Sequence, residues 1–442
     1  MLSSGAQRDK PRSATEQDSY SFKALTFEIN GSESLSEPKL GFLRLQSNKA
    51  PRLIVQPLRD FGRSRRSLRY TESRQRLLHN PQYGAAMSRH FLVNRDDLTQ
   101  TQWVEEEDQT PGPGEVLLRV DRFALTANNV TYGVAGDIIG YWQFFPAAPG
   151  WGKIPVWGIG TVVTSEHPNI ETGDRYYGYF PIASELLVKP EKISARGFTD
   201  AAEHRASLPV VYNQYSLMSA DNGFDPTFFD HYMLYRPLFT TSFVLDDYFA
   251  DQDFFGANTL ILGSASSKTA FGMAFLLKQR PGIKVVGLTS KANVSFVEGL
   301  DLYDTVLTYD RVAELPQTAS AYVDMAGNRE VLSAVHHHLN DHLKCSCGVG
   351  MTHWSSRTDA ATAPLPGAKP TMFFAPTQII KRHEELGAET YQQRIHAATT
   401  SFLAAVDAWV TIEAHSLGDT ESVYRTVLEG TSPQIGYILT NG

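Results

Sequence analysis

Residues 87–235 show the first of two patterns of apolar and polar positions along the chain. After a Pro- and Gly-rich turn at 111–114, the run 115–125 (EVLLRVDRFAL) alternates apolar and polar residues. Similar short runs follow at 154–163, 176–181 and 184–190. Alternation with a period of two is typical of half-buried strands, and the Gly and Pro residues between the runs mark turns. This density of short strands predicts a small barrel or rolled sheet.

The second pattern begins at Asn258, where strands and helices alternate. Residues 259–263 form a short apolar run, and 267–279 repeats its apolar residues with helical spacing. Further predicted strands lie at 283–288, 305–309, 321–325 and 344–349, and further predicted helices lie at 293–300 and 329–339. Such alternation predicts a doubly wound parallel sheet with right-handed crossovers. Beyond it, 377–410 is mostly helical in pattern, and 423–441 predicts a short helix and a closing strand.

Residues 1–86 show no sustained periodicity. They are rich in Ser, Arg, Pro and Gln, with a basic stretch over 59–76, as in disordered segments. We therefore expect a disordered leader at 1–86, a barrel domain at 87–235 and a doubly wound domain at 236–374, with the C-terminal segment 375–442 partly packing back on the barrel. The leader is either a dispensable extension, with Met87 as an alternative start, or an organelle-targeting segment, although its acidic residues are unusual for one.

Composition narrows the class of protein. A chain of 442 residues with 42% hydrophobic content can bury more than one core. A formal net charge of -8 argues against a general nucleic-acid partner. Cys345 and Cys347 are too few and too close for a disulfide framework, and no apolar run reaches the roughly 18 to 20 residues that cross a membrane. We expect a cytoplasmic protein without membrane or nucleic-acid partners.

Five stretches resemble a known superfamily. They are 113–120 (PGEVLLRV), 125–132 (LTANNVTY), 171–178 (ETGDRYYG), 322–327 (YVDMAG) and 423–439. In this order they are similar to the zinc-free quinone-oxidoreductase and enoyl-reductase branch of the medium-chain dehydrogenase/reductase superfamily, and within it to a divergent group known as a domain of unknown function. The resemblance implies an α/β fold, a GroES-like β-barrel domain plus a Rossmann doubly wound parallel-sheet domain, and an oxidoreductase that uses NADPH.

The resemblance places the superfamily's glycine-rich nucleotide turn on 264–270. There, glycines let the backbone approach a pyrophosphate at a helix N-terminus. In this chain small hydroxyl residues and a lysine replace the glycines, and the predicted cofactor contacts are Ser264, Ser266, Ser267, Lys268 and Thr269. Hydroxyl groups and a cation can hold a diphosphate. The alternative is an ordinary Ser-capped strand-to-helix turn that no longer binds a dinucleotide.

The end of the following predicted strand bears on the choice of cofactor. NAD-preferring Rossmann domains usually place an acidic residue there, whereas this chain has Ser290 and Lys291. A hydroxyl followed by a cation suits a 2′-phosphate, so NADPH is the expected cofactor. The alternative for Lys291 is an exposed loop lysine without a ligand.

No metal site is expected. The stretch that carries a ligand cysteine in the metal-dependent branch has Thr126, Ala127, Asn128 and Asn129 here, and the two cysteines lie in a predicted strand of the other domain. His336, His337, His338 and His342 point in different directions on a helix, which favours a solvated helix end over a metal-ligand set.

Without a metal, a reductase must stabilise the developing anion with hydrogen-bond donors and protonate it from a side chain or water. The resemblance gives as candidate catalytic residues Asn128, Tyr132, Thr241 and His353, with Asn129 and Thr240 beside them. Trp142, Trp151, Trp157 and Trp354 either line an apolar site or pack in a core.

Two functions remain open. The first is an NADPH-dependent, zinc-independent oxidoreductase that reduces an activated C=C or C=O bond of a small, fairly apolar substrate, as a monomer or a homodimer. The second is a non-redox or ligand-binding protein that keeps the scaffold and has lost dinucleotide chemistry.

Overall fold

The computed structural model describes residues 87–349 and 364–441. Residues 1–86, with the predicted leader, lie outside the described residues, as do the candidate His353 and Trp354. None of the described helices is both long and apolar enough to cross a membrane.

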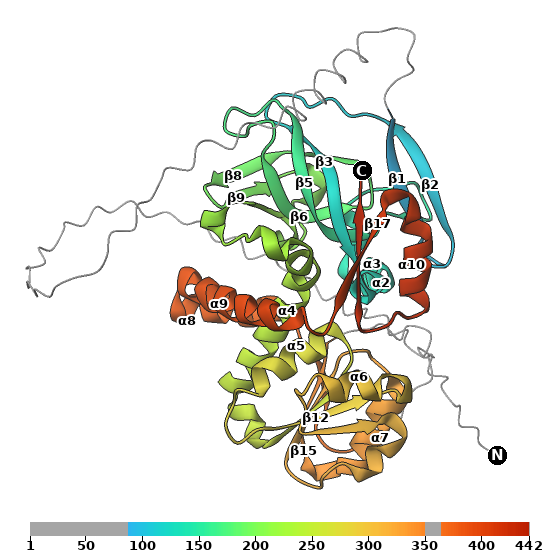
Figure 1. Ribbon diagram of the computed structural model, residues 1–442, viewed down its shortest axis with the longest axis vertical. Coiled ribbons are helices and arrows are strands. Elements are labelled where there is room, and N and C mark those ends of the chain that lie inside the picture. The colour runs from blue at the N-terminus through green and yellow to red at the C-terminus, as the bar shows by residue number, and fades with distance from the viewer. Residues whose placement is uncertain (1–86, 350–363, 442) are drawn as a thin grey trace, which may run out of the picture. The chain divides into compact units, whose positions relative to one another are not determined.

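A nine-stranded sheet, counted over the described residues, forms most of the barrel (Figure 1). Its path is β17-β18-β3-β5-β6-β10-β9-β8, and β7 pairs with β3. The strands are β3 Val116–Leu125, β5 Pro155–Ser165, β6 Arg175–Pro181, β7 Glu185–Val188, β8 Pro190–Ser194, β9 Gly197–Asp200, β10 Gln214–Leu217, β17 Thr411–Ser416 and β18 Ile435–Thr440. Alternate residues of β3, among them Val116, Leu118 and Val120, are buried in the barrel core. The alternation in the sequence therefore marks the side chains that face inward.

A second antiparallel sheet has the order β2-β1-β4, with β1 at Met87–Asn94, β2 at Thr101–Glu107 and β4 at Trp151–Gly152. Phe91 of β1 contacts Tyr424 of α10 (Thr420–Glu429), with ring centroids 5.6 Å apart. The C-terminal residues thus pack against the first described strand as well as against β3.

The second domain contains a six-stranded sheet, β13-β12-β11-β14-β15-β16, in which every pair is parallel. Its strands are β11 Thr259–Gly263, β12 Lys284–Thr289, β13 Thr305–Thr308, β14 Ser320–Asp324, β15 Leu343–Gly348 and β16 Pro370–Met372, and its helices include α5 Lys268–Leu277, α6 Val294–Gly299 and α7 Arg329–Leu339. In chain order the strands lie 3-2-1-4-5-6, which is the Rossmann order. The predicted fold class is confirmed.

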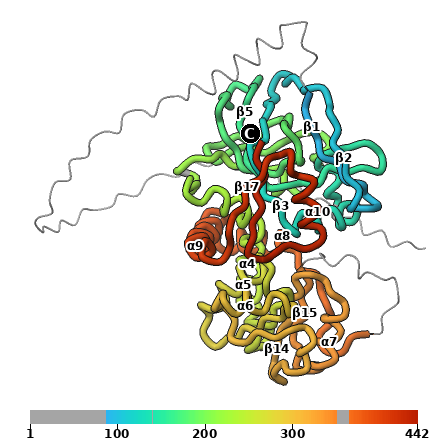
Figure 2. The backbone as a smooth tube through the Cα atoms, turned by 45° about the vertical axis from the view of Figure 1, so that its right-hand side comes forward, coloured from blue at the N-terminus to red at the C-terminus, as the bar shows by residue number. Residues whose placement is uncertain are grey.

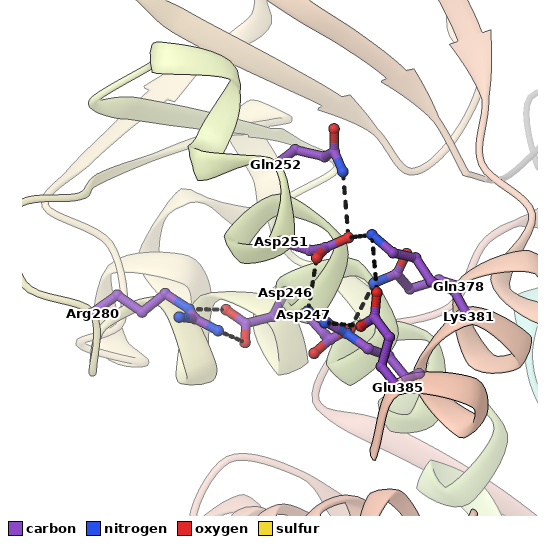
Figure 3. Close-up of polar contacts among 9 residues, drawn as sticks. Asp246, Asp247, Asp251, Gln252, Arg280, Gln378, Lys381 and Glu385 are labelled. Carbon is purple, nitrogen blue, oxygen red and sulfur yellow. Dashed lines mark hydrogen bonds and ion pairs between the residues drawn. The ribbon is translucent and has the colours of Figure 1, made fainter. Parts of the chain in front are cut away.

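Helix α4 (Phe229–Asp251) runs from the barrel to the parallel sheet. Near its C-terminal end Asp246 forms paired hydrogen bonds of 2.6 Å with Arg280, which follows α5. Asp247 accepts from Arg382 of α8 (Ala375–Leu386). Asp251 pairs with Lys381 of the same helix (Figure 3). These ion pairs connect α4 both to α8 and to the parallel-sheet domain.

The C-terminal segment returns to the barrel after α9 (Ala388–Val406). Strand β17 pairs with β18, and β18 pairs with β3 so that Tyr437 lies opposite Leu125. Figure 2 shows the C-terminal segment, in red, beside β3. Residues 411–440 therefore complete the sheet that begins near residue 116.

The prediction of a solvated helix end at the C-terminus of α7 is wrong for His336. Its side chain is fully buried, with Nδ1 2.8 Å from the Pro366 carbonyl and Nε2 2.8 Å from Ser346 Oγ. His337 and His342 are exposed as predicted. The described residues contain no group of three His, Cys, Asp or Glu side chains that could hold a metal ion.

Candidate functional site

The turn between β11 and α5 has a strained backbone. Ser264 has a φ of 52°, in the left-handed region that favours glycine, and it stands where the resembling superfamily has its first glycine. Gly263, just before it, has no room for a side chain, because an added Cβ would lie 2.6 Å from the Tyr322 hydroxyl. The turn thus keeps a left-handed residue although it contains no glycine, and the glycine just before it allows the close approach of Tyr322.

Side chains from the segments that follow β12 and flank β13 hold this turn in place. The Tyr303 hydroxyl donates to the Ala265 carbonyl over 2.8 Å, and the hydroxyls of Ser264 and Tyr309 lie 3.3 Å apart. Asn293 Nδ2 donates to Ser266 Oγ over 3.0 Å. Two of the predicted cofactor contacts, Ser264 and Ser266, therefore already have partners within the protein.

Helix α5 begins at the end of the turn. Ser267 is its N-cap, and the hydroxyl accepts from the Ala270 amide over 3.3 Å. The first amides of a helix, here those of Lys268 and Thr269, have no acceptor within the helix and point outward with the positive end of its dipole. This end of α5 can accept an anionic group through main-chain donors and the Thr269 hydroxyl.

Lys268 points toward the C-terminal segment. Its Nζ donates to the Ile435 carbonyl over 2.7 Å and to the Pro433 carbonyl over 3.2 Å. Burial lowers the pKa of Lys268 to about 8. The ammonium group thus joins the turn to β18 in this arrangement, and its contact with a diphosphate stays a prediction.

Ser290 and Lys291 follow β12 and begin a short 3-10 helix at Lys291–Asn293, of which Ser290 is the N-cap. Lys291 Nζ lies 2.9 Å from Asp310 Oδ2, and both side chains are more than half exposed. The nearby Thr308 hydroxyl and the Lys291 ammonium lower the pKa of Asp310 to about 2. Lys291 therefore follows the carboxyl end of β12, as predicted, but it forms an ion pair with an acidic residue.

On the barrel side, α2 (Ala127–Val134) carries the other predicted residues. Asn129 is buried and accepts from the Thr126 amide while its own amide donates to the Pro155 carbonyl, which is a structural role. Tyr132 is buried and accepts a hydrogen bond of 3.1 Å from Trp157 Nε1. Burial raises the pKa of Tyr132, against hydrogen bonds from Trp157 and Asn128 that lower it, so the phenol keeps its proton at neutral pH.

Tyr132 belongs to a group of packed rings that we call the aromatic wall. Its members are Tyr132, Tyr141, Trp157, Tyr177, Tyr179 and Tyr212. Trp157 is partly exposed and stacks on Tyr177 with centroids 5.5 Å apart and planes 12° apart. Trp142, by contrast, is in the barrel core, with its ring against Gly136 and Gly152. Of the candidate tryptophans, Trp157 lies in the aromatic wall and Trp142 packs in a core.

Thr241 lies in α4, where its hydroxyl donates to the Pro237 carbonyl one turn earlier over 3.1 Å. The structure therefore brings the candidates together in two groups, one at the β11–α5 turn and one on α2, with Thr241 on the helix that connects the domains. Sequence reasoning missed Tyr303, Tyr309 and Tyr322. Tyr303 and Tyr309 flank β13 and Tyr322 lies within β14, and nothing in the sequence assigned any of the three to the site.

Two solved structures of CurA share this fold. CurA from Vibrio vulnificus matches with 15% sequence identity and a TM-score of 0.51, over 80% of this chain and 99% of that one. CurA in complex with NADPH, from the same organism, matches with the same identity and coverage and a TM-score of 0.54. The yhdH oxidoreductase from Salmonella enterica in complex with NADP has 15% identity and a TM-score of 0.46, over 80% of this chain and 100% of that one. The fold is that of the medium-chain dehydrogenases/reductases.

Within this class the family is also defined. The model of the family described as "Protein of unknown function (DUF2855)" matches residues 123–433, so the chain belongs to DUF2855. A search of curated proteins finds no significant match. The predicted resemblance to a divergent group of this superfamily is confirmed.

Proposed function

We propose that this protein is an NADPH-dependent, zinc-independent oxidoreductase that reduces an activated C=C or C=O bond of a small, fairly apolar substrate. The observation that carries the proposal is the β11–α5 turn. Strand β11 lies between β12 and β14, at the point where the strand order reverses, and a helix begins directly beyond it. In open parallel sheets this is the position at which nucleotides bind.

The residues present fit a dinucleotide in two respects. The free amides at the start of α5 and the Thr269 hydroxyl can hold a diphosphate, and left-handed Ser264 keeps the backbone path that such a turn requires. CurA, which has the same fold, has been crystallised with NADPH. Ser290 and Lys291 would then hold the 2′-phosphate. Lys291 would leave its ion pair with Asp310 and bind the phosphate, which carries more negative charge.

The chemistry on the protein side falls to α2 and the aromatic wall. When bound, NADPH supplies the hydride. Trp157 Nε1 is a donor only, so Tyr132 receives that bond on its oxygen and keeps its own O–H proton for another acceptor. The Tyr132 hydroxyl and the Asn128 side-chain amide would donate hydrogen bonds that stabilise the developing enolate or alkoxide. The aromatic wall would contact the apolar part of the substrate. Thr241 and His353 stay as further candidates from the sequence.

The test is a reductase assay that follows NADPH consumption with conjugated enones, enoyl thioesters and quinones as substrates. We expect turnover with at least one of these classes, and we expect a metal chelator to leave the rate unchanged. Activity that is lost with the chelator and restored by zinc would contradict the zinc-independent mechanism.

The second candidate function is that of a ligand-binding protein without redox chemistry. It is favoured by the contacts of Lys268 with two main-chain carbonyls and by the internal partners of Ser264 and Ser266. A folded protein that binds neither NADPH nor NADH would support this second candidate and reject the first.

We also propose a cytoplasmic location and a small-molecule substrate as the partner. A homodimer is supported by the edge strand β16 and the exposed apolar residues near it, Met372, Phe374 and Ile380. Light scattering coupled to gel filtration would distinguish a dimer from a monomer.

A further inference from the structure

Arg236 on α4 is unusual among the arginines of the described residues. Ten others lie within 4.0 Å of a carboxylate, namely Arg95, Arg119, Arg122, Arg175, Arg196, Arg205, Arg280, Arg311, Arg382 and Arg425. In residues 87–349 and 364–441, Arg236 is the one partly buried arginine without such a partner. A guanidinium is always charged, so its charge is not removed by titration.

The side chains around Arg236 accept only part of the hydrogen bonds that its guanidinium can donate. Its Cζ lies 4.6 Å from the centroid of the Tyr177 ring and 5.3 Å from that of Tyr232, and Nη2 donates to Ser216 Oγ over 3.2 Å. Nη1 is buried and has no acceptor among the described residues. Contact with ring faces partly offsets the charge of a cation, but it leaves the N–H donors of Nη1 unsatisfied.

The side chains that contact Arg236 within the described part of the chain supply no negative charge. Burial raises the pKa of both Tyr177 and Tyr232, so both phenols are neutral. Ser216 receives a hydrogen bond on its oxygen and therefore has its own hydroxyl proton available for a further acceptor. Arg236 and Ser216 together present donors in need of an oxygen anion.

Arg236 is also connected to the candidate catalytic residues. Its guanidinium packs on Tyr177, Trp157 stacks on the same ring, and Trp157 Nε1 donates to Tyr132. A continuous row of contacts thus runs from Arg236 along the aromatic wall to Tyr132. An apolar, planar molecule on this wall would have a cation at one end and a phenol near the other.

We propose that Arg236 and Ser216 bind a carboxylate group of the substrate, whose apolar or conjugated body lies along Trp157. A planar guanidinium matches a carboxylate with two parallel hydrogen bonds, which supplies the acceptor that Nη1 lacks. That the bound carboxylate belongs to the substrate rests on the proposed function. The binding of a carboxylate at Arg236 does not depend on that function. The substrate class is therefore an unsaturated or aromatic carboxylic acid.

The test compares benzoate with benzamide, which has the same shape and no charge, by calorimetric titration of the full-length protein without NADPH. We expect benzoate to bind the wild type and to lose at least tenfold in affinity in Arg236→Met, while Arg236→Lys loses less. Benzamide should bind all three proteins equally weakly. Arg175→Met is the matched control, because Arg175 also lies over a ring, that of Phe229, but has Asp121 as a partner.

Equal benzoate affinity in the wild type and Arg236→Met, or no benzoate binding by the folded wild type, would overturn the proposal. If Arg236→Met does not fold, Arg236→Lys and Ser216→Ala test the proposal in its place. Each should weaken the binding of benzoate but not that of benzamide. A separate NADPH titration tests the cofactor. Benzoate binding that depends on Arg236 in a protein without NADPH binding would support the carboxylate site and reject the reductase.

Discussion

The buried contact of Lys268 with the C-terminal segment predicts how the stability of the protein depends on pH. Burial lowers the pKa of Lys268 from 10.5 to about 8 in the folded state. Between these values the unfolded chain binds more protons than the folded one, so the free energy of unfolding rises with pH. The stabilisation from this group is fully present above pH 10.5 and is lost as pH falls through 8.

The magnitude follows from the two pKa values. Between pH 7 and pH 9 the contribution of Lys268 grows by at most about 1.3 kcal/mol. In Lys268→Met this contribution is absent at every pH. The variant also leaves the carbonyls of Pro433 and Ile435 without their donor, which lowers stability by an amount that does not depend on pH.

The assay is urea unfolding of the wild type and Lys268→Met at several pH values between 7 and 9. Tyrosines and cysteines titrate in both proteins, so their effects cancel in the difference between the two curves. We expect the wild type to gain about 1.3 kcal/mol relative to the variant over this range. Parallel pH profiles of the two proteins would contradict the burial of the Lys268 ammonium group.

Three further predictions concern the cofactor, Tyr132 and the leader. Lys291→Ala should weaken NADPH about tenfold and leave NADH unchanged in paired titrations, as expected for one charge-assisted contact; equal losses for both cofactors would contradict a 2′-phosphate site. Tyr132→Phe should lower kcat by on the order of 100-fold with little change in NADPH affinity, and an unchanged kcat would exclude Tyr132 as a donor to the developing anion. Deletion of residues 1–86 should leave NADPH affinity and the melting temperature unchanged, and a fall of more than about 4 °C would indicate that the leader packs on the body.

The parallel sheet could be predicted from the sequence because its strands are short apolar runs separated by helical spacing, and the strand ends fall within a few residues of the predicted positions. Helix α4 was missed. It buries residues on several sides, including Met233, Val244 and Phe249, and it contains Pro237, so it has no single apolar stripe. Strand β17 was also missed, because none of its residues is fully buried.

The site was harder to predict, since its contacts join residues far apart in the chain. The two carbonyls that accept from Lys268 are more than 160 residues away in the chain, and the sequence near position 268 does not predict them. His336 was predicted to lie in a solvated helix end because consecutive helical positions point in different directions, whereas it is buried and hydrogen-bonded to Pro366 and Ser346. Arg236 became a candidate only from the packed structure, because the structure shows that no described carboxylate lies within 4.0 Å of it.

The central claim is that the β11–α5 turn binds NADPH, and a fluorescence titration of NADPH tests it most directly. The wild type should bind NADPH, and Thr269→Glu should lose at least tenfold in affinity, because it places an acid beside the free amides of α5. Thr400→Glu, at an exposed position in α9, is the control and should bind as the wild type does. A folded wild type without NADPH binding, or a Thr269→Glu variant with unchanged affinity, would contradict the account.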